Sequence, residues 1–439
     1  MPPAPNPPNA IGRALDLLAR FAGSAFVQRH ALLRPAERAV YLGTRTGFQA
    51  VVRAQRVFKR ATRGDAIRLG RPGRETDLFD CDLAEEQQLM QATVGELARS
   101  VLRPAASAAE DARACPPEVR LRAAELGLMG LCVPEAHGGL ASERSLLTQV
   151  IVAEALARGD MGLALALLAP LSAACALTEW GTGSQQATYL APFTGDAPPL
   201  ATIAVDEPTP LFNPYAPACR ATPDGDGWRL HGDKRLVPLA GRAALWLVSA
   251  STPRGPRVFL VEAGATGVSV RPAGSMGLAA AELGDLRFDR VRLSRDALLG
   301  DDTFDHARFV DHASLGWCAL ATGCAQAVLD YVIPYCNERE AFGEPISHRQ
   351  AVAFMVADLA IELDGLRMLA YRAASRADLG LPWHREVFLA RTLAGEVAMR
   401  AGDHGVQLLG GHGYTKDHPV ERWYRDLRAV AVLHGGLHL

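Results

Sequence analysis

The spacing of apolar residues divides the chain into helical and β-forming stretches. Residues 84–198 carry apolar positions at helical intervals. From residue 201 to about residue 293 the pattern changes to short alternating runs broken by Gly, Asp and Pro, which is typical of β-structure. Long helical patterns centred on 309–338, 346–376 and 385–409 follow. The pattern predicts an α+β protein, mostly helical, with an N-terminal helical bundle, a middle β domain and a C-terminal four-helix bundle.

The same pattern suggests where the domains begin and end. A chain of 439 residues is too long for one hydrophobic core. We expect a basic amphipathic extension at 1–80, a helical domain at 81–199, a β domain at 200–304 and a helical bundle at 305–439.

The N-terminal extension is predicted to contain two basic amphipathic helices, over 11–26 and 48–58. The first 64 residues hold 11 Lys or Arg and 2 acidic residues, a charge of about +9. Because the whole chain has a net charge of −2, the remaining residues carry about −11. Such helices lie on anionic membrane surfaces, which would place residues 11–63 on a membrane. The alternative is that their apolar faces pack on the body of the protein or on another subunit.

Composition narrows the class of protein and its location. No apolar run reaches the roughly 18 residues that span a bilayer, and residues 161–177 are expected to form a buried helix. Eight scattered cysteines without a CxxC pair favour a reducing cytosol, with the thiols as core residues. We expect a cytoplasmic protein, with the inner face of the membrane as the alternative location. We expect no metal site and no nucleic-acid partner.

Two motifs in the predicted C-terminal bundle carry the chemistry. Residues 339–350 read Arg-x-x-Phe-Gly-x-x-Ile-x-x-x-Gln, and residues 407–413 read Gln-x-x-Gly-Gly-x-Gly. A helix is predicted to stop at Gly410 and Gly411, because glycine adopts positive φ at little cost. The two motifs together resemble the acyl-CoA dehydrogenase family of flavoenzymes, and the resemblance extends from about residue 84 to the end of the chain.

The resemblance implies a fold, a reaction and partners. The family has a helical bundle, a small β-barrel and a second bundle, with FAD between the barrel and the C-terminal bundle. It removes an α-proton from an acyl-CoA thioester while a β-hydride passes to flavin N5, which gives a 2-enoyl-CoA. Electrons then leave to an electron-transfer flavoprotein or a similar acceptor.

The resemblance also assigns residues to the cofactor. Arg339 corresponds to the guanidinium that reaches the FAD pyrophosphate, and Phe342 packs nearby. The remaining matched positions line the adenosine-diphosphate portion: Gln350, Gln407, Gly410 and Gly411. In the family these groups come largely from the neighbouring subunit, which implies a homodimer, a homotetramer or a hetero-oligomer with a paralogue.

The groups that a subunit supplies to its own flavin are altered. The usual Thr-Glu-Pro-x-x-Gly-Ser-Asp loop begins here at Asp206 and lacks the Gly-Ser-Asp. The usual Trp-Ile-Thr is replaced by Leu236-Val237-Pro238, and Pro238 has neither a hydroxyl nor a backbone N–H for flavin N5. The resemblance assigns Asp206, Val237 and Gly436 to the flavin in this altered setting.

The catalytic base is the largest departure. The position of the family's usual glutamate, eight residues after Asp426, holds His434. The position used by some relatives holds Ala313, and Asp311 lies about 200° away around the helix. Neither position carries a carboxylate.

Three hypotheses follow from this departure. His434 serves as the base, since a neutral imidazole accepts protons at neutral pH. Alternatively, the chain is a subunit of a hetero-oligomer that completes a partner's FAD site. In the third hypothesis it is a non-catalytic, membrane-docked scaffold. For His434 itself, the simplest interpretation is a histidine on an exposed tail.

Overall fold

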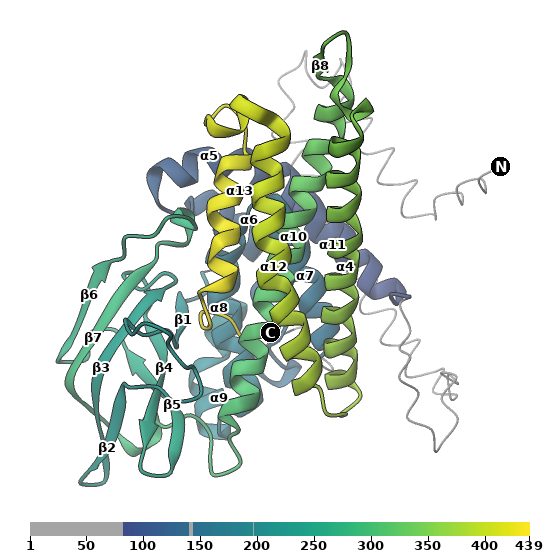
Figure 1. The fold of residues 1–439 in the computed structure, drawn as a ribbon. Coiled ribbons are helices and arrows are strands. Elements are labelled where there is room, and N and C mark those ends of the chain that lie inside the picture. The colour runs from purple at the N-terminus through teal and green to yellow at the C-terminus, as the bar shows by residue number, and fades with distance from the viewer. Residues whose placement is uncertain (1–81, 140–143, 196) are drawn as a thin grey trace, which may run out of the picture. The chain divides into compact units, whose positions relative to one another are not determined.

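A computed structural model describes residues 82–139, 144–195 and 197–439. The chain divides into two units, 1–78 and 79–439. The amphipathic helices expected over 11–26 and 48–58 lie outside the described residues, so they remain a prediction. Figure 1 shows the described elements in order along the chain.

The first described part is helical, as expected. Its elements are α4 (Glu85–Leu97), a π-helical turn η1 (Ala98–Leu102), α5 (Arg103–Ala112), α6 (Pro117–Glu125), α7 (Leu146–Gly159), α8 (Met161–Trp180) and α9 (Gly183–Tyr189). Asp160 begins α8, because its side chain accepts the backbone N–H of Leu163 at 2.9 Å. Every residue of α8 from Met161 to Leu177 is buried, which confirms the predicted buried helix.

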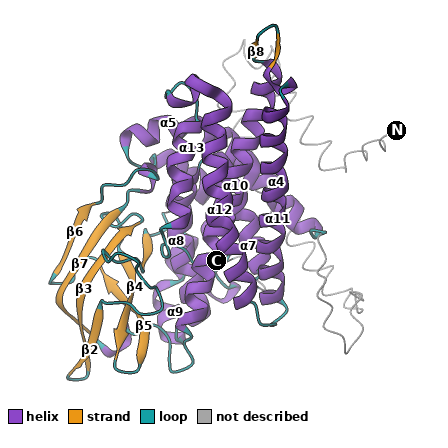
Figure 2. Ribbon diagram, viewed as in Figure 1, coloured by secondary structure: helices purple, strands orange, loops and turns teal. Residues whose placement is uncertain are grey.

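The middle part is a seven-stranded sheet. Its strands are β1 (Ala201–Ala204), β2 (Arg220–Asp224), β3 (Gly227–Val237), β4 (Leu245–Thr252), β5 (Gly255–Glu262), β6 (Val268–Pro272) and β7 (Gly284–Leu293). The hydrogen-bonded order is β1-β4-β2-β3-β7-β6, and β5 pairs with β4. The sheet has its own apolar core, which includes Leu230, Phe259 and Phe288. Figure 2 shows the strands gathered on one side of the helices, where α8 contacts β1.

The C-terminal bundle is organised around one long helix, α10 (His306–Glu338). The chain continues through the hairpin β8 (Glu340–Ala341) and β9 (Glu344–Pro345) to α11 (Gln350–Asp378), α12 (His384–Leu409) and α13 (Val420–Leu427). Helix α10 packs against α7, α11, α12 and α13. It crosses α7 closely at Gly323, where an added Cβ would lie 2.1 Å from the Glu154 carbonyl oxygen.

Among the residues that the structure describes, two helices, α8 and α10, are long and apolar enough to cross a membrane. The most apolar windows of these helices are 94% and 78% buried inside the protein, so both pack as core helices here. The seven cysteines in the described part of the chain are all buried and free, which confirms that they serve as core residues.

Candidate functional site

The structure separates the residues assigned to the cofactor into two groups. The first, which we call the bundle-end group, is exposed and consists of Arg339, Phe342, Gln350, Gln407, Gly410 and Gly411. Its two motifs lie at the same end of the helical bundle (Figure 1). They are brought together where the Tyr335 hydroxyl lies 3.2 Å from His412 Nδ1.

The backbone of the bundle-end group agrees with the sequence. Helix α12 ends at Leu409, and Gly410 has φ +57° as predicted. The β8–β9 hairpin turns at Phe342 and Gly343, with φ +59° and +83°. Positive φ is strained for a bulky residue such as Phe342, whose side chain is 98% exposed. Within the described residues, the Arg339 guanidinium makes no hydrogen bond or ion pair, so it is free to bind an anion.

The second group lies inside the protein, where the β domain meets the last residues of the chain. The backbone N–H groups of His434 and Gly435 donate to the two carboxylate oxygens of Asp206, at 2.8 and 2.7 Å. Burial raises the pKa of Asp206 to about 6, while these two hydrogen bonds and the charge of Lys234 act in the opposite direction. Val237, also assigned to the flavin, is buried and pairs with Gly284 of β7.

Glu207, which matches the glutamate of the family's Thr-Glu-Pro loop, has a structural role. Its Oε1 accepts from Lys234 Nζ at 2.7 Å, and both side chains are buried. Glu207 also accepts the backbone N–H groups of Ala218 and Cys219, at 2.7 and 3.0 Å. A buried ion pair is stable only when its remaining polar atoms have hydrogen-bond partners. Here the hydrogen bonds of Glu207 fix the 206–219 loop on β3.

Gly436 lies against the position where the family has a threonine. It has φ +82°, and a Cβ added there would lie 2.9 Å from Pro238 Cγ. The backbone of Gly436 therefore lies directly against Pro238.

The surroundings of the His434 imidazole differ from those of an exposed histidine. Its ring is half-buried and lies edge-on to Phe212, with 6.1 Å between ring centroids. Burial, and then the nearby Arg391 guanidinium, lower the pKa of His434 to about 4. The ring nitrogens make no hydrogen bond among the described residues. His434 therefore offers a neutral imidazole with a free acceptor nitrogen.

The other candidate positions for the base do not offer a free carboxylate. Ala313 is fully buried in α10. Asp311 points to the start of α12, where its carboxylate lies 2.8 Å from His384 Nδ1. The side chain of Asp311 is thus engaged by His384.

The segment after His434 corrects the interpretation of an exposed tail. Residues Gly435 to Leu439 are all buried, and Leu437 and His438 have no exposed surface. The indole N–H of Trp317, on α10, donates to the Gly435 carbonyl oxygen at 2.9 Å. We call residues 435–439 the buried tail.

The buried tail ends in a polar cluster that the sequence did not reveal. Glu179 Oε2 lies 3.1 Å from His438 Nε2 and 3.2 Å from His312 Nε2, and Arg144 also pairs with it. Arg308 reaches Glu179 Oε1 at 3.1 Å. Burial acts to raise the pKa of Glu179, but the two histidines and Arg144 hold it below its usual range. No sequence motif joins residues that are 259 positions apart.

This cluster anchors the tail rather than binding a metal. Glu179, His312 and His438 could each offer a ligand atom within 4.8 Å of the others. A divalent cation there would lie beside the guanidinium groups of Arg144 and Arg308, and repulsion between like charges opposes this arrangement.

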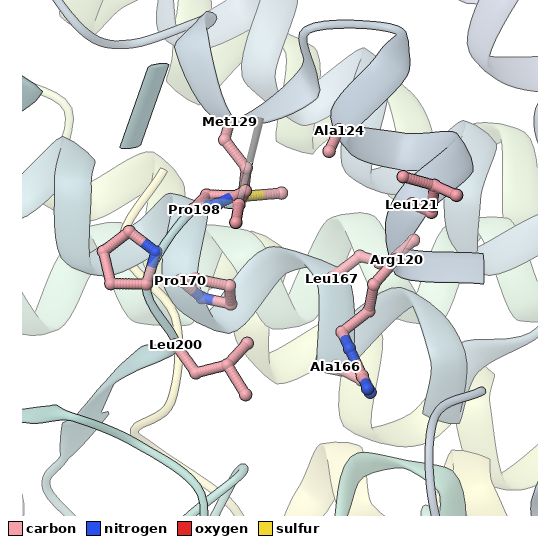
Figure 3. Close-up of a pocket in the computed structure, with 11 residues that line it drawn as sticks. Arg120, Leu121, Ala124, Met129, Ala166, Leu167, Pro170, Pro198 and Leu200 are labelled. Atoms are coloured by element: carbon pink, nitrogen blue, oxygen red, sulfur yellow. The ribbon is translucent and has the colours of Figure 1, made fainter. Parts of the chain in front are cut away.

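A separate apolar cavity of about 240 Å³ lies between α6, α8 and residues 197–200 (Figure 3). Ala166, Leu167 and Pro170 of α8 line it, whereas Leu165 faces Gly436 of the buried tail. At 100° per residue these positions lie on different faces of α8. The cavity is therefore separate from His434.

Comparison with known proteins accounts for this arrangement. Family models described as the N-terminal, middle and C-terminal domains of acyl-CoA dehydrogenase match residues 84–196, 202–291 and 306–436. The chain belongs to the acyl-CoA dehydrogenase family. This is a family of FAD-dependent oxidoreductases, so the family and fold predicted from the two motifs are confirmed.

Individual relatives resemble the chain over most of its length. It is 32% identical to the mitochondrial short-chain specific acyl-CoA dehydrogenase of Bos taurus over 366 residues, 81% of this chain and 88% of the relative. It is 31% identical to the glutaryl-CoA dehydrogenase of Desulfococcus multivorans, over 82% of this chain and 96% of the relative. The structure of butyryl-CoA dehydrogenase from Megasphaera elsdenii matches with a TM-score of 0.74 and 26% identity, over 82% and 96% of the two chains.

We expect His438→Gln to reduce the acid sensitivity of this acyl-CoA dehydrogenase family member. Burial, and then His312, lower the pKa of His438 to about 3. On acidification the unfolded chain therefore takes up a proton that the folded chain does not, and stability is lost as the pH falls below the ordinary value of about 6.5. Between about pH 7 and about pH 5 this loss is about 2 kcal/mol, and glutamine removes it.

The measurement is urea denaturation of both proteins at the two pH values. The control is His348→Gln, at an exposed position of the bundle. An undiminished acid loss in His438→Gln would show that His438 is not held neutral by the fold.

Proposed function

We propose that the protein is an FAD-dependent acyl-CoA dehydrogenase whose active site is shared between two subunits. The bundle-end group of one subunit would bind the adenosine-diphosphate part of FAD. The half-buried His434 of the other would face its flavin, with the buried Asp206, Val237 and Gly436 behind it. The observation that carries this proposal is the exposed Arg339, which has no partner in its own subunit within the described residues.

The distance between the two groups supports a shared site. Trp317, which holds the buried tail, lies in α10, 22 residues before Arg339, which follows the end of this helix. At 1.5 Å per residue that separation is roughly 33 Å. The two groups are thus far apart within one subunit, and a second copy of the chain can bring them together at one cofactor.

Exposed apolar side chains support oligomerisation. Phe354 and Ile361 of α11 and Phe388 of α12 are 58%, 71% and 65% exposed. Large apolar side chains that are exposed on helical surfaces are typical of protein interfaces. We assign this face of the bundle to contact with another subunit.

The proposed reaction is the α,β-dehydrogenation of an acyl-CoA thioester. FAD, when bound, supplies the acceptor for the β-hydride. The neutral imidazole of His434 takes the α-proton, so that the substrate loses one proton and one hydride and becomes a 2-enoyl-CoA. Asp206 positions His434 by holding its backbone N–H. We propose that an electron-transfer flavoprotein or a similar acceptor then takes the electrons.

A second candidate function rests on Gly436 and Pro238. Their contact covers the surface that faces the flavin in the family, so the chain's own site would be closed. The chain would then be a subunit of a hetero-oligomer and would supply only its bundle-end group to the partner's FAD. Copurification of flavin with this chain alone would argue against this candidate.

Arg339→Ala is expected to weaken FAD binding about 10- to 100-fold, because it removes a charged hydrogen bond to the pyrophosphate. Arg339→Lys should retain part of the affinity. The measurement is a fluorescence titration of the apoprotein with FAD. The matched control is Arg385→Ala, which removes an exposed arginine at the opposite end of α12. Equal FAD affinity in Arg339→Ala and the wild type would contradict the assignment.

His434→Gln is expected to slow flavin reduction by acyl-CoA about 10²- to 10⁴-fold without changing flavin content. In the wild type the base must be unprotonated, so the rate should stay constant down to about pH 5 and fall below it, as a group with a pKa of about 4 is protonated. Stopped-flow absorbance of the flavin band measures both effects.

The control for the base is His231→Gln, on an exposed position of β3. A His434→Gln protein that reduces its flavin at the wild-type rate would rule out His434 as the base. Such a result would require a different base, and it would also argue against the hetero-oligomer, because the chain's own site would then be open.

A further inference from the structure

The buried tail follows His434 directly, and its Leu437 packs on α10 in the core of the protein. We propose that Leu437 forms the floor of the acyl site and restricts this enzyme to short acyl chains. This inference rests on the proposed function, and it adds a specificity-determining residue and the length class of the substrate.

The direction of the substrate follows from its chemistry. Coenzyme A is large and polyanionic, so it stays in solvent, while an apolar acyl chain is stabilised by burial. An acyl group whose α-carbon lies beside His434 must therefore extend inward. The residues on that side are those of the buried tail, beginning with Gly435 at Asp206.

The tail is packed tightly against α10. A Cβ added at Gly316 would lie 3.0 Å from both Cβ and Cδ1 of Leu437, and 3.4 Å from Cγ of Leu439. Leu437 has no exposed surface, and Leu439 is 1% exposed. The absence of a side chain at Gly316 thus gives Leu437 its place, and little room remains for further methylene groups.

Polar contacts at both ends hold the tail in place. Trp317 donates to the Gly435 carbonyl oxygen, and His438 Nε2 lies 3.1 Å from Glu179 Oε2. Withdrawal of the tail would break these contacts and remove two leucines from the core. Such a segment acts as a fixed wall and not as a mobile lid, because unpaired buried polar groups are costly.

The neighbouring side chains give the wall its shape. Leu165 of α8 lies 3.9 Å from where a Cβ of Gly436 would be, and Pro238 lies closer on the other side. The tail is thus enclosed between α8, α10 and the end of β3. A longer acyl chain would have to displace Leu437 itself.

The test compares straight-chain substrates in the wild type and in Leu437→Ala, both loaded with FAD. The rate of anaerobic flavin bleaching is measured with butyryl-, hexanoyl-, octanoyl- and decanoyl-CoA. The wild type should prefer butyryl-CoA. Because alanine leaves space for about two or three carbon atoms, the ratio of octanoyl- to butyryl-CoA rates should rise about tenfold or more in the variant.

Two control variants distinguish the loss of the Leu437 side chain at the acyl site from a general loss of core packing. Leu437→Met conserves volume and should keep the wild-type order of substrates. Leu230→Ala shortens a fully buried leucine in the separate core of the β domain and should also keep it. An unchanged order in Leu437→Ala, or wild-type rates as high with decanoyl-CoA as with butyryl-CoA, would overturn the inference.

A binding measurement keeps this outcome distinct from failure of the proposed function. If no acyl-CoA bleaches the flavin, the dehydrogenase proposal fails. S-Butyl-, S-hexyl- and S-octyl-CoA thioethers, which cannot react, are then titrated by calorimetry. If the wild type binds the butyl compound more tightly than the octyl compound, and Leu437→Ala loses this preference, the result supports Leu437 as the floor of the acyl site. Equal affinities, or no binding, would overturn it.

Discussion

The carboxylate of Asp206 accepts the backbone N–H groups of His434 and Gly435, and this contact joins the β domain to the last segment of the chain. A buried carboxylate requires such partners, because its desolvation is otherwise uncompensated. Through it the imidazole of His434 faces Phe212, and the following residues enter the core. The position of the candidate base therefore depends on a residue in a different domain.

The buried tail has consequences on both of its sides. Toward the β domain, Gly436 covers Pro238, where the family resemblance places a hydroxyl for the flavin. Toward the helices, Leu437 fills the space left by Gly316, and His438 reaches Glu179. The buried tail thus contacts the β domain on one side and fills the space beside α10 on the other.

Features set by local chemistry could be predicted from the sequence. Helix α12 ends at Leu409 because Gly410 takes positive φ. The burial of α8 follows from its uninterrupted apolar composition. The two motifs at the bundle end could be recognised because their residues lie close together in sequence.

Features set by distant contacts could not be predicted. The sequence suggested an exposed tail, because nothing near His434 indicates the contacts that bury it. Those contacts come from Asp206, Trp317 and Glu179, which lie in separate parts of the chain. The sequence around Gly316 does not indicate that Leu437 packs against this glycine. The bundle-end and interior groups are likewise separated by about two-thirds of the length of α10.

A shared site is the central claim, and complementation between subunits tests it most directly. Arg339→Ala and His434→Gln proteins, each inactive for a different reason, are unfolded together, refolded with FAD and assayed for flavin reduction by acyl-CoA. In a mixed dimer one of the two sites contains both wild-type groups, so about a quarter of wild-type activity should return. No recovery, with mixed dimers shown to form, would contradict a site built from two subunits.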